Sequence, residues 1–202
     1  LDYGSPEEAR GVINRWVEGE TRQKIKNLLP EGSIDSMTRM VLTNAIYFKG
    51  NWVTQFKVKS TRELPFRLAA GKSAKTPMMF QKGNFGFFQD EEVQVLEMPY
   101  KGEKVSMVAL LPRKVDGLAA LEKNLSAGKL SGWLGKLRRV KVDTLFPKFK
   151  MTSRFDLSGK LQDLGMKKAF RDADFSGMDG TRNLYLSAVF HKAFVEVNEE
   201  GT

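Results

Sequence analysis

The side chains able to do chemistry are few in this sequence. It contains one histidine, His191, and no cysteine, so a two-histidine zinc motif, a cysteine nucleophile and a disulfide are excluded over this stretch. A Ser-His-Asp triad would have to use His191, which lies inside the apolar run 187–195. A buried histidine in a strand is more often a hydrogen-bonded structural residue than a general base. No nucleophile elbow, phosphate-binding loop or dinucleotide-binding fingerprint occurs, and we expect a protein that is not an enzyme.

Positive charge is the other chemical feature. The 202 residues contain 33 Lys plus Arg against 24 Asp plus Glu, a formal net charge of +9. Such a balance could attract a polyanion such as a glycosaminoglycan or nucleic acid, or it could simply keep the surface solvated. The densest basic stretch lies where one helix is predicted to end and the next strand to begin. Its members are Lys129, Lys136, Arg138, Arg139 and Lys141. A solvated helix face is the competing interpretation of this cluster.

The elements that must position these residues begin with a helix. Ser5 and Pro6 suit a helix start, and apolar residues then recur at helical spacing up to Val17. The run from Met40 to Phe48 is almost uninterrupted and is typical of a strand buried on both faces. Short or edge strands are expected between Gly50 and Gly83, where Pro65 and Pro77 interrupt the apolar pattern.

The second half of the chain predicts further strands joined by short helices. A hairpin is expected over 93–100 and 105–111, around a polar turn that contains Gly102. Helices are expected over 118–125, 130–137 and 157–164, and strands over 140–149 and 184–197. A helix followed mostly by strands favours an α+β fold with a dominant sheet, in one domain without an internal boundary. No segment has the roughly 18 uncharged residues of a membrane span.

Several segments together resemble the serpin family, and the resemblance covers essentially all 202 residues. The strongest segments are Asn44-Ala-Ile-Tyr-Phe-Lys-Gly-Asn-Trp52 and His191-Lys-Ala-Phe-Val-Glu-Val-Asn-Glu-Glu-Gly-Thr202. Supporting segments are Pro6-Glu-Glu-Ala-Arg10, Ile13-Asn14, Trp16-Val17, Pro77-Met78-Met79, Leu96-Glu-Met-Pro-Tyr100, Leu110-Leu111-Pro112 and Phe146-Pro147-Lys148-Phe149.

The resemblance implies a serpin fold, with a large, mostly antiparallel central sheet, surrounding short helices and a second sheet or barrel region. The first helix would cross the face of the central sheet, 40–52 would form an interior strand, and 184–198 its neighbour. The implied function is inhibition of a serine protease, with a cysteine protease as the alternative target. In inhibitory serpins the target cuts a reactive loop and stays joined to it as an acyl-enzyme, while the loop inserts between these two strands.

Three groups of residues take roles from the resemblance. The hinge leading into the reactive loop would be Glu199, Glu200, Gly201 and Thr202. Asn44 and His191 would hydrogen-bond beneath the sheet where its strands part. Trp52, Lys148 and Glu199 would mark the point where the loop enters, with Lys148 and Glu199 forming a pair. Plain core packing is an equally good interpretation of Trp52.

The hinge residues suit insertion on physical grounds. Gly201 supplies backbone freedom, and Thr202 is short and β-branched, so a strand accepts it. A large charged residue at Thr202 would have to be desolvated, at a cost of several kcal/mol. Glu-Glu-Gly-Thr taken alone would instead be typical of a solvated turn after a strand.

The sequence leaves two other functions open: a non-inhibitory serpin acting as a carrier or chaperone, and a serpin that binds heparin or another polyanion. The resemblance also predicts a fragment, which lacks early helices, the reactive loop beyond Thr202 and the C-terminal strands. The remaining segments of the same serpin would then be partners of this chain. We expect no cofactor, no metal and no membrane partner. An extracellular, secreted location is favoured, with an intracellular one left open.

Overall fold

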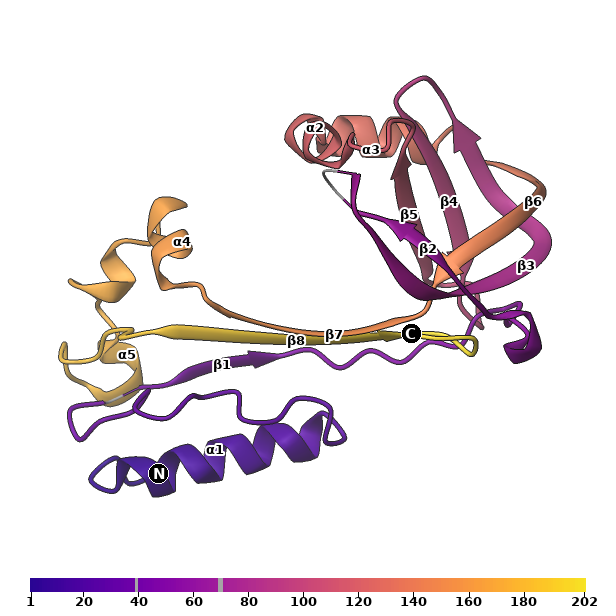
Figure 1. Ribbon diagram of the computed structural model, residues 1–202. Coiled ribbons are helices and arrows are strands. Elements are labelled where there is room, and N and C mark those ends of the chain that lie inside the picture. Colours follow the sequence, from indigo (N-terminus) through magenta and orange to yellow (C-terminus); the bar gives the residue numbers. More distant parts are fainter. Residues whose placement is uncertain (39, 69–70) are drawn as a thin grey trace. The chain divides into compact units, whose positions relative to one another are not determined.

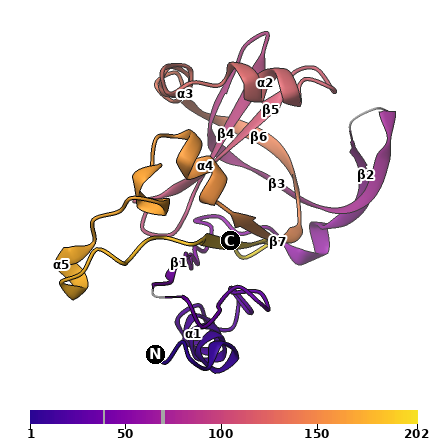
Figure 2. The ribbon, with the colours of Figure 1, turned by 90° about the vertical axis from the view of Figure 1, so that its left-hand side faces the viewer.

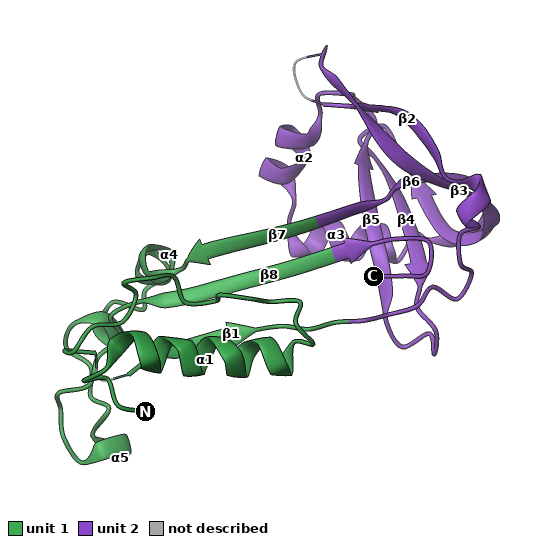
Figure 3. Ribbon diagram, turned by 60° about the horizontal axis from the view of Figure 1, so that its bottom comes forward, with its two compact units in different colours: residues 1–48, 151–195 green, residues 49–150, 196–202 purple. Residues whose placement is uncertain are grey.

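The computed structural model describes residues 1–38, 40–68 and 71–202. The chain divides into two compact units, each built from separate stretches of sequence (Figure 3). Unit 1 contains residues 1–48 and 151–195, and unit 2 contains residues 49–150 and 196–202. The prediction of a single domain stays a prediction.

Unit 1 holds the long helix α1 and most of a three-stranded sheet. Helix α1 spans Pro6–Glu20, and the sheet has the order β1-β8-β7, formed by Leu42–Ala45, Val189–Val197 and Phe149–Asp156 (Figure 1). Strands β1 and β8 are parallel neighbours, with Asn44 directly opposite His191. Short helical segments connect β7 to β8: α4 (Ser158–Asp163), η3 (Lys168–Phe170) and α5 (Ser176–Asp179).

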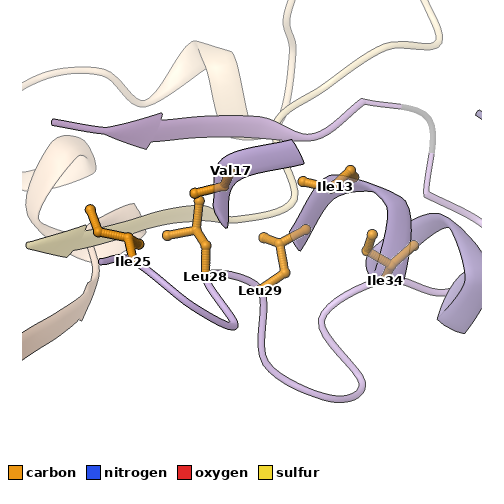
Figure 4. Packing of buried hydrophobic residues seen from close by; sticks show 6 residues of the cluster. All are labelled: Ile13, Val17, Ile25, Leu28, Leu29 and Ile34. Atoms are coloured by element: carbon orange, nitrogen blue, oxygen red, sulfur yellow. The ribbon is translucent and has the colours of Figure 1, made fainter. Parts of the chain in front are cut away.

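The core of unit 1 joins α1 to the segment that follows it. Ile13 and Val17 of α1 pack with the side chains of Ile25, Leu28, Leu29 and Ile34 (Figure 4). Ala45 of β1 and Phe190 of β8 pack against the same cluster, so the helix covers one face of the sheet as the resemblance implied. Asn14 fixes this arrangement, because its amide donates to the Leu29 carbonyl at 3.0 Å and accepts from the Leu29 N–H at 2.9 Å.

The apolar run 40–48 differs from the prediction of a strand buried on both faces. Only Leu42–Ala45 forms a strand, and its side chains alternate in exposure. Leu42 and Ile46 are 50% and 66% exposed, because α1 covers only the opposite face. Within the described residues β1 also lies at the end of its sheet and not in the interior, since no strand among them pairs with its second edge.

Unit 2 is built on a five-stranded antiparallel sheet. Its strands are β2 (Arg62–Arg67), β3 (Ser73–Gln89), β4 (Val93–Pro99), β5 (Ser106–Pro112) and β6 (Arg138–Pro147). The order is β2-β3-β4-β5, and β6 pairs with β3 along Met78–Phe87. The predicted hairpin is confirmed as β4 and β5, and the short helix η1 (Val58–Ser60) precedes β2.

Two helices close one end of this sheet. α2 (Leu118–Asn124) and α3 (Ala127–Leu134) lie beside β4 and β5 (Figure 2). Leu121 of α2 and Trp133 of α3 pack on Val93 and Val95 of β4, and all four side chains are buried. Among the described residues, no helix combines the length and the apolar character that a transmembrane span needs.

We predict that the Asn14 side chain is worth more to stability than its size indicates. In the full-length protein Asn14→Ala should lower the free energy of unfolding by about 2 kcal/mol, because the Leu29 N–H would be left buried and unpaired and the Leu29 carbonyl would keep only its 3.3 Å bond from Arg10. Urea denaturation followed by circular dichroism measures the effect. Arg15→Ala is the control, since Arg15 is exposed on the same helix and should change stability by under about 0.5 kcal/mol. Equal midpoints for the two variants would contradict this role of Asn14.

Candidate functional site

The chain folds back on itself directly after β8. The N–H of Asn198 donates to the carbonyl of Gly201 at 3.0 Å, which closes a turn. The side-chain oxygen of Asn198 accepts from the N–H groups of Glu200 at 2.9 Å and Gly201 at 3.2 Å. The predicted hinge is therefore a hydrogen-bonded turn that Asn198 organises.

The turn is also attached to residues 50–52. The N–H of Thr202 donates to the carbonyl of Gly50, and the N–H of Gly50 donates back to Thr202, both at 2.9 Å. The N–H of Trp52 donates to the carbonyl of Glu200 at 2.9 Å. A Cβ atom at Gly201 would lie 2.8 Å from the Cα of Asn51 and would overlap the carbonyl oxygen of Gly50. Glycine at position 201 is thus required by close backbone contact and not only by flexibility.

Glu199 is a buried carboxylate at the start of the turn, with 5% of its surface exposed. Its two oxygens accept from the ammonium of Lys148 at 2.9 Å and from the hydroxyl of Thr61 at 2.7 Å. Its backbone carbonyl accepts from the N–H of Phe56 at 3.0 Å. Burial acts to raise the pKa of Glu199, but the hydrogen bonds from Lys148 and Thr61 outweigh it and hold the pKa below its usual value.

Trp52 and Tyr100 form an aromatic pair beside the hinge. Trp52 is 2% exposed, and its indole Nε1 donates to the carbonyl of Asn198 at 3.0 Å. The two rings stack with centroids 4.7 Å apart, and the hydroxyl of Tyr100 donates to the hydroxyl of Thr202 at 2.8 Å. Burial raises the pKa of Tyr100. Trp52 is thus both a core residue and a direct contact of the hinge.

The structure brings together all the residues predicted for the hinge and for the point where the loop would enter. The ion pair expected between Lys148 and Glu199 is present. Sequence reasoning missed Thr61 and Tyr100. Nothing in the sequence around Thr61 marks it, whereas Tyr100 ends the segment Leu96–Tyr100 that contributed to the resemblance.

The second predicted pair, Asn44 and His191, lies in unit 1. The two residues face each other across the parallel strands β1 and β8, but the described residues contain no hydrogen bond between their side chains. His191 is half-buried, and its ring stacks on Phe155 of β7 with centroids 6.4 Å apart. The expectation of a buried histidine is therefore wrong, because α1 and the segment after it cover only one face of the sheet. A role of this pair in sheet opening stays a prediction.

The predicted basic cluster is divided in the structure. Lys129 forms an ion pair with Glu92 at 2.8 Å, and the ammonium of Lys136 lies 5.3 Å from the centre of the Phe88 ring. Residues 138, 139 and 141 follow one another along β6, and successive side chains on a strand point to opposite faces. Arg138 therefore projects from one face of the sheet, and Arg139 and Lys141 from the other.

Comparison with known proteins gives one family. The profile of the family described as Serpin (serine protease inhibitor) matches residues 1–202. Human Serpin B3 is 50% identical over 100% of this chain and 53% of its own length, and human leukocyte elastase inhibitor is 44% identical over 97% and 54%. The structure of ovalbumin from emu superposes with a TM-score of 0.94 at 38% identity, covering 100% of this chain and 54% of that one.

The chain belongs to the serpin family. The predicted fold class is confirmed, because both the family match and the superposition extend over the whole chain. The family is one of protease inhibitors and not of enzymes, as the sequence led us to expect. The chain spans about half the length of the relatives that it matches.

The depressed pKa of Glu199 predicts an acid-sensitive hinge. A carboxylate with a lowered pKa contributes stability above the usual glutamate value of about 4.3 and loses it as pH falls through the lower folded-state value. We expect Glu199→Gln to lower the stability of the full-length protein by about 1–2 kcal/mol at pH 7. The variant should also weaken the loss of stability between about pH 5 and 3.

Thermal unfolding at a series of pH values provides the measurement. Glu63→Gln is the matched control, because Glu63 is exposed on β2 in the same unit and should retain the pH dependence of the unmodified protein. The assignment is wrong if Glu199→Gln and Glu63→Gln give the same pH profile.

Proposed function

We propose that the protein containing this chain is a serine-protease inhibitor that acts as a suicide substrate. The target cuts the reactive loop, remains attached as an acyl-enzyme, and is trapped when the loop inserts as a new strand between β1 and β8. The observation that carries the proposal is the parallel pairing of β1 with β8, followed directly by a hinge held in a turn. A chain that reverses after β8 could enter between these strands antiparallel to both.

The free energy of backbone pairing favours this insertion. An inserted strand forms ladder hydrogen bonds along both edges, and the only bonds lost within the described sheet are those between Leu42–Ala45 and Val189–Lys192. At about 1 kcal/mol net for each bond, a long inserted strand gains on the order of 10 kcal/mol. The state before insertion is then kinetically trapped, with the contacts of the hinge contributing to the barrier.

The side chains at the leading end of the hinge fit the proposal. Gly201 has no side chain to accommodate, and Thr202 combines a short side chain with β-branching, so both can enter a packed sheet. Glu199 must give up Lys148 and Thr61 if the hinge moves, which sets a cost on opening before cleavage. These features favour inhibition over a carrier or chaperone function.

The partner proposed from the relatives is a target protease. One relative is named leukocyte elastase inhibitor, which supports a serine protease, and a cysteine protease is the alternative. The other half of the same serpin is the second partner, because this chain covers about half of its relatives. We also propose that the protein is secreted, and this proposal is based on the sequence alone.

A specific observation keeps polyanion binding as a second candidate function. Arg139 and Lys141 project from the same face of β6, opposite Gly86 and Asn84, and the described residues place no ion pair on either side chain. Side chains two residues apart on a strand, such as these, are separated by about 7 Å. A linear sulfated polysaccharide could follow this spacing. Lys129 contributes less, because Glu92 already neutralises it.

Trapping can be tested with the full-length protein and a panel of trypsin, chymotrypsin and pancreatic elastase. We expect an SDS-stable complex with at least one of them, and a higher melting temperature after cleavage of the loop. Thr202→Arg should abolish the complex and the gain in melting temperature while leaving cleavage intact, because inserting an arginine would bury a charge at a cost of several kcal/mol.

Ser131→Arg is the control for this test, because the same new side chain then sits at an exposed position of α3. It should trap protease normally. An unmodified protein that every protease cuts, that forms no complex and that gains no thermal stability would rule out the inhibitor proposal in favour of a carrier.

Polyanion binding is tested by elution of the full-length protein from immobilised heparin. The double variant Arg139→Ala/Lys141→Ala should elute at lower salt, and the slope of log affinity against log salt should fall by about one for each side chain removed. Arg138→Ala is the matched control, because it removes the neighbouring charge from the opposite face of β6. Identical retention of both variants and the unmodified protein would remove this candidate.

A further inference from the structure

Thr202 is held by its side chain as well as by its backbone. Its hydroxyl accepts from the hydroxyl of Tyr100 at 2.8 Å, in addition to the two backbone bonds with Gly50. Tyr100 directly follows β4, whereas Thr202 is the last residue of the predicted hinge, so this bond ties the hinge to the five-stranded sheet of unit 2. It is separate from the Lys148–Glu199 pair at the other end of the turn.

The position of Tyr100 is fixed by contacts that run back to the hinge. Its ring stacks on Trp52 with an interplanar angle of 14°, and its backbone forms an antiparallel bridge with Trp52. Trp52 in turn binds the carbonyls of Asn198 and Glu200. The contacts therefore form a closed ring from Asn198 through Trp52 and Tyr100 to Thr202, and the Tyr100 hydroxyl is its last member.

We propose that Tyr100 is a positioning residue that latches the hinge before insertion, through the bond from its hydroxyl to Thr202. This inference rests on the proposed function, because a latch matters only if the hinge moves. When Thr202 enters the sheet it leaves Gly50 and Tyr100 together, so the hydroxyl bond exists only in the state before insertion. Tyr100 thereby sets the rate at which the loop inserts and leaves the inserted form unaffected.

The neighbourhood of the bond makes it suitable for a latch. Tyr100 is 6% exposed, so little water is available to replace Thr202 as a partner during the first step of opening. The two hydroxyls lie on residues 102 positions apart in sequence, so the bond breaks only when the two segments separate. Threonine at position 202 thus has two uses: its shape suits the inserted strand, and its hydroxyl restrains the strand beforehand.

The test uses the full-length protein and compares Tyr100→Phe, Thr202→Val and the double variant. Each removes the bond and keeps the side-chain shape. We expect either single variant to raise the rate of conversion to a urea-resistant inserted form about fivefold at fixed temperature, which corresponds to about 1 kcal/mol. The double variant should be no faster than either single one. Thr202→Ser should keep the unmodified rate, because it keeps a hydroxyl.

A second measurement separates a latch from a general structural role. The melting temperature of the loop-cleaved, inserted form should be the same for Tyr100→Phe and the unmodified protein, whereas a structural residue would lower it. Tyr185→Phe, at an exposed tyrosine of unit 1, should alter neither rate nor melting temperature. Additive rates in the double variant, an unchanged or slower rate in Tyr100→Phe, or an equally destabilised inserted form would each overturn the latch.

The same experiment distinguishes failure of the latch from failure of the proposed function. If the unmodified protein inserts its loop and traps a protease while Tyr100→Phe inserts at the same rate, only the latch is wrong. If the unmodified protein never reaches an inserted form, neither after cleavage nor on heating, the proposed function is wrong and the latch with it.

Discussion

The buried carboxylate of Glu199 constrains the whole hinge. A carboxylate that is removed from water must have its oxygens satisfied, and here Lys148 and Thr61 satisfy them from two different segments of unit 2. This fixes the start of the turn, and the turn then places Glu200, Gly201 and Thr202 against residues 50–52. A hinge without this anchor would be the solvated turn that its composition alone predicts.

The anchor also explains why the packing around the hinge has to be so close. With Glu199 fixed, the following backbone runs against Gly50 and Asn51 with no space for a side chain at position 201. Glycine satisfies this turn, and in the proposed inserted strand it would add no side chain that has to be packed. If the hinge inserts as proposed, position 201 requires a residue suited to both arrangements, since a side chain that fitted only one of them would abolish the other.

The parts of the fold that depend on local pattern could be predicted from the sequence. Helical spacing of apolar residues predicted α1, a polar turn predicted the β4–β5 hairpin, and alternation of apolar and polar residues predicted β6. The length of β3 could not be predicted, because Pro77 and Gly83 interrupt its pattern and pairing with three other strands holds it extended. The exposed face of β1 was missed for a related reason: an apolar run does not show which of its faces is covered.

The candidate site divides in the same way. Trp52, Lys148 and the hinge were found because they lie in segments with a family resemblance, whereas Thr61 and Tyr100 act through single hydroxyl groups that no spacing rule identifies. The basic cluster shows the opposite error. Five positive residues close in sequence were grouped, but strand alternation places Arg138 on the face opposite Arg139, and Glu92 neutralises Lys129. Proximity in sequence is thus weak support for a charged surface on a strand, and buried hydrogen bonds between distant segments can be found only in the folded chain.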